Sequence, residues 1–116
     1  MRTIRVTNAA NGKLVGDEIA VAESSLTRLF GLMGRRNLEP GHGLLITPSS
    51  GVHTFGMRFA IDVVGLDHEW LVVGVWPELK PYRLSGISMK YKSMLELPPG
   101  RIAACGITVG DQLLQG

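Results

Sequence analysis

Hydrophobic and polar residues alternate along several short stretches of the chain, which is the pattern of strands with one buried face. The stretch Thr3–Thr7 shows it clearly. Asn11 and Gly12 follow and tolerate a positive φ, so they predict a tight turn and a return strand over Leu14–Ala22. Further β-prone runs bounded by turn residues predict strands over Gly43–Ile46, Ile61–Leu66, Trp70–Trp76 and Met94–Leu97, and a turn within Val109–Leu113 that leads into a last short strand.

One stretch has the period of a helix instead. Ser24 is a suitable N-cap residue, and an apolar stripe at i, i+3, i+4 and i+7 follows it, formed by Leu26, Leu29, Phe30 and Met33. Gly34 can end this helix. The run Arg101–Cys105 fits either one helical turn or a strand, and Pro77 and Pro81 are expected to open an irregular stretch rich in Gly and Ser.

These elements predict a mostly β (α+β) fold. So many strands in a small chain need their edges closed or covered. We therefore expect a compact, barrel-like, largely antiparallel sheet with one short helix in the N-terminal half. The length of 116 residues and the apolar fraction of 45% fit a single domain over residues 1–116.

The charge and the cysteine content limit which partners and which covalent links are expected. The formal net charge is only +2, without the dense basic clusters that grip phosphate backbones, so no nucleic acid is expected. A small anionic ligand remains possible. Cys105 is the single cysteine, which excludes an internal disulfide. Neither a signal-peptide pattern nor an apolar run of about 20 residues is present, so we expect a cytoplasmic protein without a membrane partner.

The segment Val52–Asp62 has the most unusual composition in the chain. It gathers a titratable ring, a hydroxyl, an aromatic ring, a thioether, a cation and a carboxylate, which makes ligand-binding candidates of His53, Thr54, Phe55, Met57, Arg58 and Asp62. If the run is extended, His53 and Met57 share one face, while Thr54 and Arg58 share the other. Arg58 could then clamp a carboxylate or phosphate with its planar fork.

Three residues are candidates for catalysis: His53, Asp62 and Glu96. His53 could act as an acid or base near neutral pH, and either carboxylate could orient it. A purely structural interpretation competes with this one: Met57 and Phe55 would be core residues, and Arg58 would pair with Asp62.

No metal site is predicted. The three histidines, His42, His53 and His68, lack the spacing of metal ligands. The sequence also contains none of the common phosphate-binding or dinucleotide-binding motifs, so no cofactor can be named.

Several motifs in order resemble the domain-of-unknown-function family 192, also called uncharacterised protein family 0127. The motifs are Gly31–Arg35, Gly43–Ile46, Val52–Met57, Ile61–Val64, Leu95–Gly100 and Gly110–Asp111. The resemblance implies a compact, mainly β domain of bacteria and archaea; we expect a bacterial source. It assigns no catalytic residue. Similar members often have a cysteine after the proline that matches Pro48, whereas Ser49 stands there in this chain.

Three hypotheses follow. The first is a binding module, in which the Val52–Arg58 loop and the Trp76–Ser88 stretch hold a small anionic or sugar-like ligand or a partner. Its candidate contacts are aromatic residues expected to be exposed, interleaved with cations: Trp76, Lys80, Tyr82, Arg83, Lys90, Tyr91 and Lys92. The alternatives are a small enzyme with His53 as general base, and a structural or assembly subunit whose oligomeric state the sequence does not set.

Overall fold

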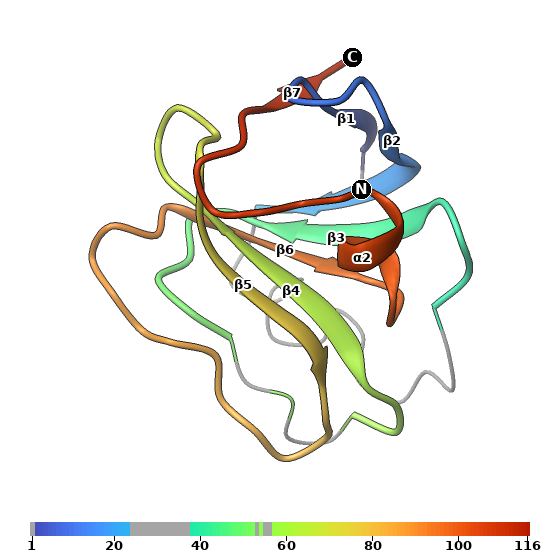
Figure 1. Ribbon diagram of the computed structural model, residues 1–116. Helices are drawn as coiled ribbons and strands as arrows, with labels where there is room; N and C mark the ends of the chain where they lie inside the picture. The colour runs from blue at the N-terminus through green and yellow to red at the C-terminus, as the bar shows by residue number, and fades with distance from the viewer. Residues whose placement is uncertain (1, 24–37, 53, 55–56) are drawn as a thin grey trace.

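The computed structural model describes residues 2–23, 38–52, 54 and 57–116. Within these residues, seven strands and one short helix form the domain shown in Figure 1. The elements are β1 (Thr3–Asn8), β2 (Leu14–Ala22), β3 (His42–Ile46), β4 (Ile61–Leu66), β5 (Val72–Leu79), β6 (Ser93–Leu97), α2 (Arg101–Ala104) and β7 (Leu113–Gln115). The predicted mostly β fold is confirmed.

The strands form one sheet in the order β5-β4-β6-β3-β2-β1-β7. All neighbours are antiparallel except β2 and β3, which run parallel. A parallel pair needs a long connection, and the chain between Ala22 and His42 provides it. The helix predicted to begin after Ser24 falls in that connection and lies outside the described residues.

The two outer strands of the sheet approach each other at one end. Leu71, just before β5, forms an isolated bridge with Gln112, just before β7. Beside it, the amide of Val72 donates to the carbonyl of Asp111 at 2.8 Å. The sheet is therefore a half-barrel whose edges are tied together at one point, which agrees with the expected barrel-like arrangement.

One core cluster fills the inside of this curled sheet. It contains buried residues from all seven strands, together with Ile102 of α2 and the adjacent Cys105 and Ile107. The helix is one turn long, and its Ile102 joins the cluster from one end. Cys105 is a buried free thiol whose pKa is raised by burial, as expected for a cysteine that packs as a small hydrophobe.

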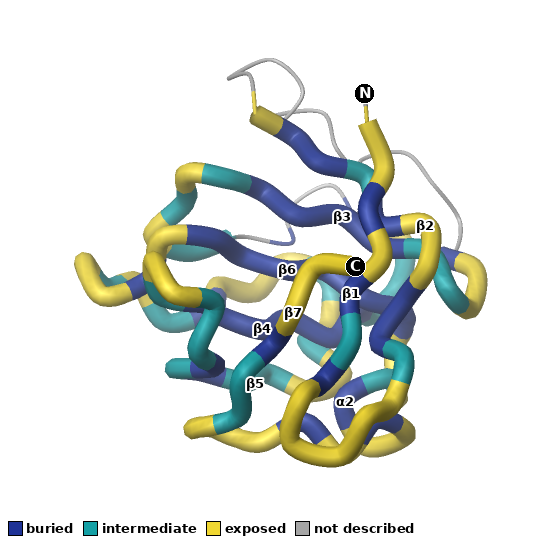
Figure 2. Tube along the Cα trace, turned by 90° about the horizontal axis from the view of Figure 1, so that it is seen from above, coloured by how far each residue is buried: buried dark blue, intermediate teal, exposed yellow. Residues whose placement is uncertain are grey.

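A second core cluster lies on the other face of the central strands. It joins residues of β2, β3, β4 and β6 to Leu38, Met57 and Tyr91, which come from segments outside the sheet. Because both faces are covered, every residue of β4 and β6 is buried, and these strands are dark throughout most of their length in Figure 2.

The structure corrects two details of the sequence interpretation and decides a third. Pro77 does not open the irregular stretch, because β5 continues through it to Leu79; the stretch begins after β5 and includes Pro81. An edge strand tolerates proline, since its free N–H side needs no partner. The strand expected from Trp70 begins at Val72 instead. The run from Arg101, left open by the sequence, is the helical turn α2.

Candidate functional site

Two segments that are far apart in the sequence run side by side over the second core cluster. We call residues 48–52, 54 and 80–92 together the paired-loop surface; Figure 1 shows them at the lower left of the sheet. Backbone hydrogen bonds link them from Ser49 N–Lys92 O (2.9 Å), through Ser88 N–Ser50 O (3.1 Å) and Ser85 N–Val52 O (3.0 Å), to Thr54 N–Arg83 O (2.9 Å). The pairing is antiparallel and fixes the shape of both loops.

The side chain of Thr54 adds further hydrogen bonds to this pairing. Its side chain is fully buried. The hydroxyl donates to the carbonyl of Lys80 at 2.6 Å and accepts from the amide of Arg83 at 2.8 Å. Buried backbone groups need partners of this kind, so this predicted ligand-binding residue holds the loops together and does not face solvent.

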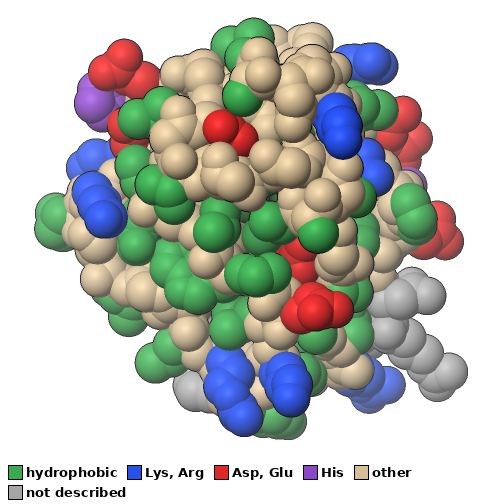
Figure 3. Space-filling model, viewed as in Figure 1, with side chains coloured by type: hydrophobic (Ala, Val, Ile, Leu, Met, Phe, Trp, Pro, Cys, Tyr) green, Lys and Arg blue, Asp and Glu red, His purple; other side chains and the backbone are tan. Residues whose placement is uncertain are grey.

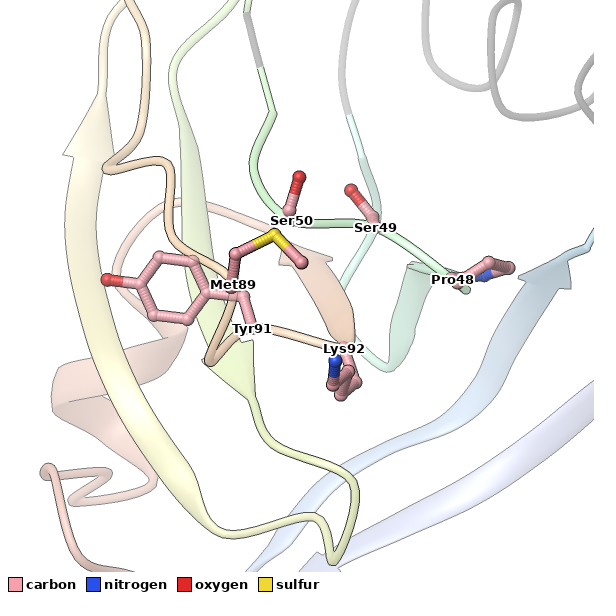
Figure 4. A pocket seen from close by; sticks show the side chains of 6 residues that line it. All are labelled: Pro48, Ser49, Ser50, Met89, Tyr91 and Lys92. Atoms are coloured by element: carbon pink, nitrogen blue, oxygen red, sulfur yellow. The ribbon is translucent and has the colours of Figure 1, made fainter.

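A hollow of about 310 Å³ lies at one end of the paired-loop surface. Six residues line it, three from each segment: Pro48, Ser49, Ser50, Met89, Tyr91 and Lys92. Figure 4 shows the hydroxyls of Ser49 and Ser50 on the same side, with the Met89 sulfur next to Ser50. The Ser49 hydroxyl donates to the carbonyl of Gly51 at 2.7 Å. The hollow therefore combines an apolar wall with hydroxyls and one cation.

A smaller hollow of about 150 Å³ continues along the same surface. Its lining residues are Ser50, Gly51, Val52, Leu84 and Ile87. Ser50 belongs to both hollows, so the two depressions adjoin there. The smaller one has aliphatic walls, and none of the described residues that line it is charged.

Two aromatic rings anchor the long loop to the sheet. Trp76 of β5 and Tyr91 meet edge to face, with ring centroids 5.6 Å apart and planes at 84°. Glycines at 65, 74 and 86 leave room for them: a Cβ at Gly74 would stand 2.7 Å from Cη2 of Trp76. Trp76 is half-buried and Tyr91 is 8% exposed. The expectation that these two rings are exposed is therefore wrong, and of the three aromatic candidates only Tyr82 is exposed.

Asp62 is an internal anchor of the fold. Its side chain is fully buried and accepts three backbone hydrogen bonds, from Glu78 N (2.8 Å), Gly100 N (3.1 Å) and Ile102 N (2.7 Å). One carboxylate thus ties β4 to β5 and to the start of α2. The alternative partner, Arg58, is exposed and takes part in none of the ion pairs recorded for the described residues.

Glu96 is the second buried carboxylate. It lies in β6 between Leu44 of β3 and Val63 of β4, which are its register partners, and it is 5% exposed. No described residue donates a recorded hydrogen bond to its side chain. Burial raises the pKa of Glu96 to about 7, because a low-dielectric environment disfavours the charged form.

Of the other predicted site residues, one is buried in the core and two lie outside the described residues. Met57 is buried in the second core cluster, as the structural interpretation of the sequence expected. His53 and Phe55, both central to the sequence hypotheses, lie outside the described residues. The sequence did not single out Ser50, Met89 and Lys92 as parts of one hollow. Only the pairing of the loops, which has no local signal, brings them together.

Among the described residues, no three His, Cys, Asp or Glu side chains gather as a metal site requires. None of the helices in that part of the chain is long and apolar enough to cross a bilayer.

The fold and the paired loops define a class: a small β half-barrel domain with one short described helix and a long, hydrogen-bonded loop pair over its outer face. The chain belongs to domain-of-unknown-function family 192, described as Uncharacterized ACR, COG1430, whose profile matches residues 6–115. A relative from Pyrococcus furiosus, described as a UPF0127 protein, is 34% identical over 112 residues, covering 91% of this chain and 93% of its own length. The resemblance inferred from the ordered motifs is confirmed.

Two solved structures share the fold. One is a protein of unknown function from Novosphingobium aromaticivorans, with a TM-score of 0.82, 19% identity, and coverage of 97% of this chain and 83% of its own. The other, from Sinorhizobium meliloti, is described as a candidate transcription regulator. It has a TM-score of 0.82, 22% identity and coverage of 98% and 94%. At these identities the likeness shows the fold alone.

Proposed function

We propose that this domain is a binding module for small anionic ligands and that its site is the larger hollow of the paired-loop surface. One observation carries the proposal: hydrogen bonds lock two distant segments into a hollow of about 310 Å³ with serine hydroxyls and Lys92 on its wall. Concave sites with apolar walls and a few polar groups are the usual form of small-molecule sites. The ammonium of Lys92 favours a carboxylate or phosphate.

The test is a titration followed by amide chemical shifts. Acetate, citrate and inorganic phosphate are expected to shift the signals of Ser49, Ser50 and Lys92 in a saturable way. Glucose and trehalose represent the sugar-like alternative. Lys92→Gln should weaken anion binding about tenfold, which is roughly 1.4 kcal/mol. Lys13→Gln is the matched control, because its ammonium lies 3.5 Å from the carbonyl of Ala104 and lines neither hollow.

Two outcomes would count against the proposal. If none of these anions moves the three amides, the hollow is not an anion site. If the sugars move them and the anions do not, a neutral ligand replaces the anionic one.

A small enzyme is the second candidate, and Glu96 is the observation in its favour. A carboxyl group with a pKa of about 7 is suited to general acid–base work at neutral pH. Glu96 lines neither hollow, so a substrate would have to reach it from the face of the second core cluster. A panel of ester, phosphoester and glycoside substrates tests this candidate: turnover that Glu96→Gln leaves unchanged would reject Glu96 as its catalytic group.

A further inference from the structure

The positive charge of the chain is concentrated in the paired-loop surface. Residues 80–92 include four cations and no acidic residue: Lys80, Arg83, Lys90 and Lys92. The whole chain has 12 Lys and Arg and 10 Asp and Glu. Without this segment, eight cations and ten anions remain, so the rest of the chain has a formal charge of −2 while the segment has +4. In Figure 3, cationic side chains lie at the lower and left margins of the face, along the course that this segment takes in Figure 1, and others lie on the right side of the face.

Exposed apolar side chains gather in the same segment. Among the described residues, six large hydrophobic side chains are exposed, and four of them belong to it: Tyr82 (63%), Leu84 (56%), Ile87 (71%) and Met89 (81%). Single exposed apolar residues are ordinary, but a group of them on one surface marks an interaction site. The hydrogen bonds to Ser49, Ser50, Val52 and Thr54 hold this segment in place, so its side chains are presented without a large ordering cost on binding.

The two hollows lie one after the other along the paired-loop surface. Leu84 and Ile87 flank the smaller hollow, Met89 and Tyr91 flank the larger one, and Ser50 joins the two. The depressions therefore follow the chain from 84 to 92. An elongated site with two successive hollows fits a chain-like ligand better than a compact one.

Apolar contacts alternate with cations along this path. Arg83 precedes Leu84, and Lys90 follows Met89, with its ammonium 5.7 Å from the centre of the Tyr91 ring. A complementary ligand carries carboxylates next to aliphatic groups. Nucleic acid fits less well, because single strands stack their bases on several exposed rings, and of the three aromatic residues here only Tyr82 is exposed, while Trp76 and Tyr91 are packed against glycines. A bilayer favours an apolar face set apart from its cations, whereas here cations are interleaved with apolar residues around hollows.

We propose that the paired-loop surface docks an extended, acidic peptide segment of a partner protein, with aliphatic side chains in the two hollows and carboxylates beside Lys90, Lys92 and Arg83. This inference rests on the proposed anion-binding function and extends it from one hollow to both. Charge complementarity orients such a partner and selects against basic segments.

The probe is a fluorescein-labelled peptide of about eight residues that alternates Asp with Leu, which spans roughly 26 Å when extended. Fluorescence anisotropy should show saturable binding. Two control peptides replace either all Asp with Lys or all Leu with Ser, and each should bind at least about tenfold more weakly. Vesicles of phosphatidylglycerol and phosphatidylcholine form the membrane arm, read by co-sedimentation.

The variants separate charge from apolar contact. The pair Lys90→Glu and Lys92→Glu, and separately the pair Ile87→Ser and Met89→Ser, should each weaken binding at least about tenfold. All four positions are exposed, so the fold should tolerate the changes. The matched controls are Arg5→Glu, an exposed cation of β1, and Leu114→Ser, an exposed apolar residue of β7 that is 48% exposed; both should bind as the unchanged chain does.

Several results would overturn the inference. The inference falls if the lysine peptide binds as tightly as the aspartate peptide. It also falls if the four surface substitutions weaken binding no more than the two controls do. Co-sedimentation with anionic vesicles without any peptide binding would replace the peptide by a lipid surface. If acetate, citrate or phosphate binds the larger hollow and the peptide does not, the inference falls while the proposed function stands; if neither binds, both fall.

Discussion

Asp62 and Glu96 lie one register step apart on neighbouring strands, and their side chains point to opposite faces of the sheet. Asp62 pairs with Leu97, and Glu96 pairs with Val63. Leu97 belongs to the inner core cluster and Val63 to the outer one. Side chains alternate between faces along a strand, so the two carboxylates cannot share one cavity. Asp62 and Glu96 therefore do not form an acid–base pair in this fold.

Asp62→Asn should destabilise the domain. The substitution keeps the shape but replaces one acceptor oxygen by an NH₂ group, which faces backbone N–H donors and cannot accept from them. Hydrogen bonds to a charged acceptor are worth about 1.5–3 kcal/mol each, and we expect the free energy of unfolding to fall by about 2–4 kcal/mol. Urea denaturation measures it. Asp17→Asn, at an exposed position of β2, is the control; equal stability of the two variants would contradict the anchoring role.

Glu96 should make the stability of the domain fall as the pH rises. The pKa of Glu96 is about 7 in the folded protein against 4.5 for the free side chain. Between these values the folded state binds more protons than the unfolded state, so the free energy of unfolding decreases with increasing pH. The decrease is roughly 3 kcal/mol in total and is complete above about pH 7.

Glu96→Gln should remove this dependence, because glutamine does not titrate. Denaturation curves at pH 5 to 8, chosen as roughly the interval over which this carboxyl titrates, give the measurement. Glu39→Gln changes an exposed carboxylate and should leave the dependence intact. A slope that persists in Glu96→Gln would assign the effect to other groups.

Thr54→Val should loosen the paired-loop surface. The change removes the hydroxyl that serves Lys80 and Arg83 and leaves two backbone groups without it, at a cost of about 1–3 kcal/mol. Amide hydrogen exchange should rise in residues 80–85 more than in β1 or β2. Thr3→Val, at an exposed position of β1, is the control. Unchanged exchange in 80–85 would show that the backbone bonds alone hold the loops.

Gly74→Ala should displace the aromatic pair. The added methyl would stand 2.7 Å from Cη2 of Trp76 and 3.1 Å from the hydroxyl of Tyr91, closer than packed atoms tolerate. Overpacking of this kind costs typically about 1–3 kcal/mol. Trp76→Phe in the same chain removes the conflicting ring atoms and should recover part of the loss. A double variant no more stable than Gly74→Ala would mean that the clash lies elsewhere.

Much of the sheet could be predicted from the sequence because its signals are local. The bounds of β2 and of β4 follow directly from apolar runs between turn residues, and Gly12 adopts the positive φ of 73° expected of its turn. These features depend on a few consecutive residues and on one buried face.

The site could not be predicted in the same way because it is made by tertiary pairing. Nothing in the sequence near Ser50 shows that it will lie beside Met89. Asp62 likewise gives no sign of which amides it will meet, since they come from β5 and from the start of α2. The sequence identified Val52–Asp62 as unusual, but three of its candidate residues, Thr54, Met57 and Asp62, are buried in the interior of the protein.

The path of β5 has a consequence for how any partner can approach. After the bridge at Leu71, none of the described strands pairs with the outer side of β5. Pro77 lacks an N–H on that strand, and Glu78 adopts a left-handed φ of 52°. Irregularities of this kind block strand addition by a second chain, including the edge-to-edge stacking that starts aggregation. Recognition at this edge of the sheet therefore proceeds through side chains rather than by addition of a strand to β5.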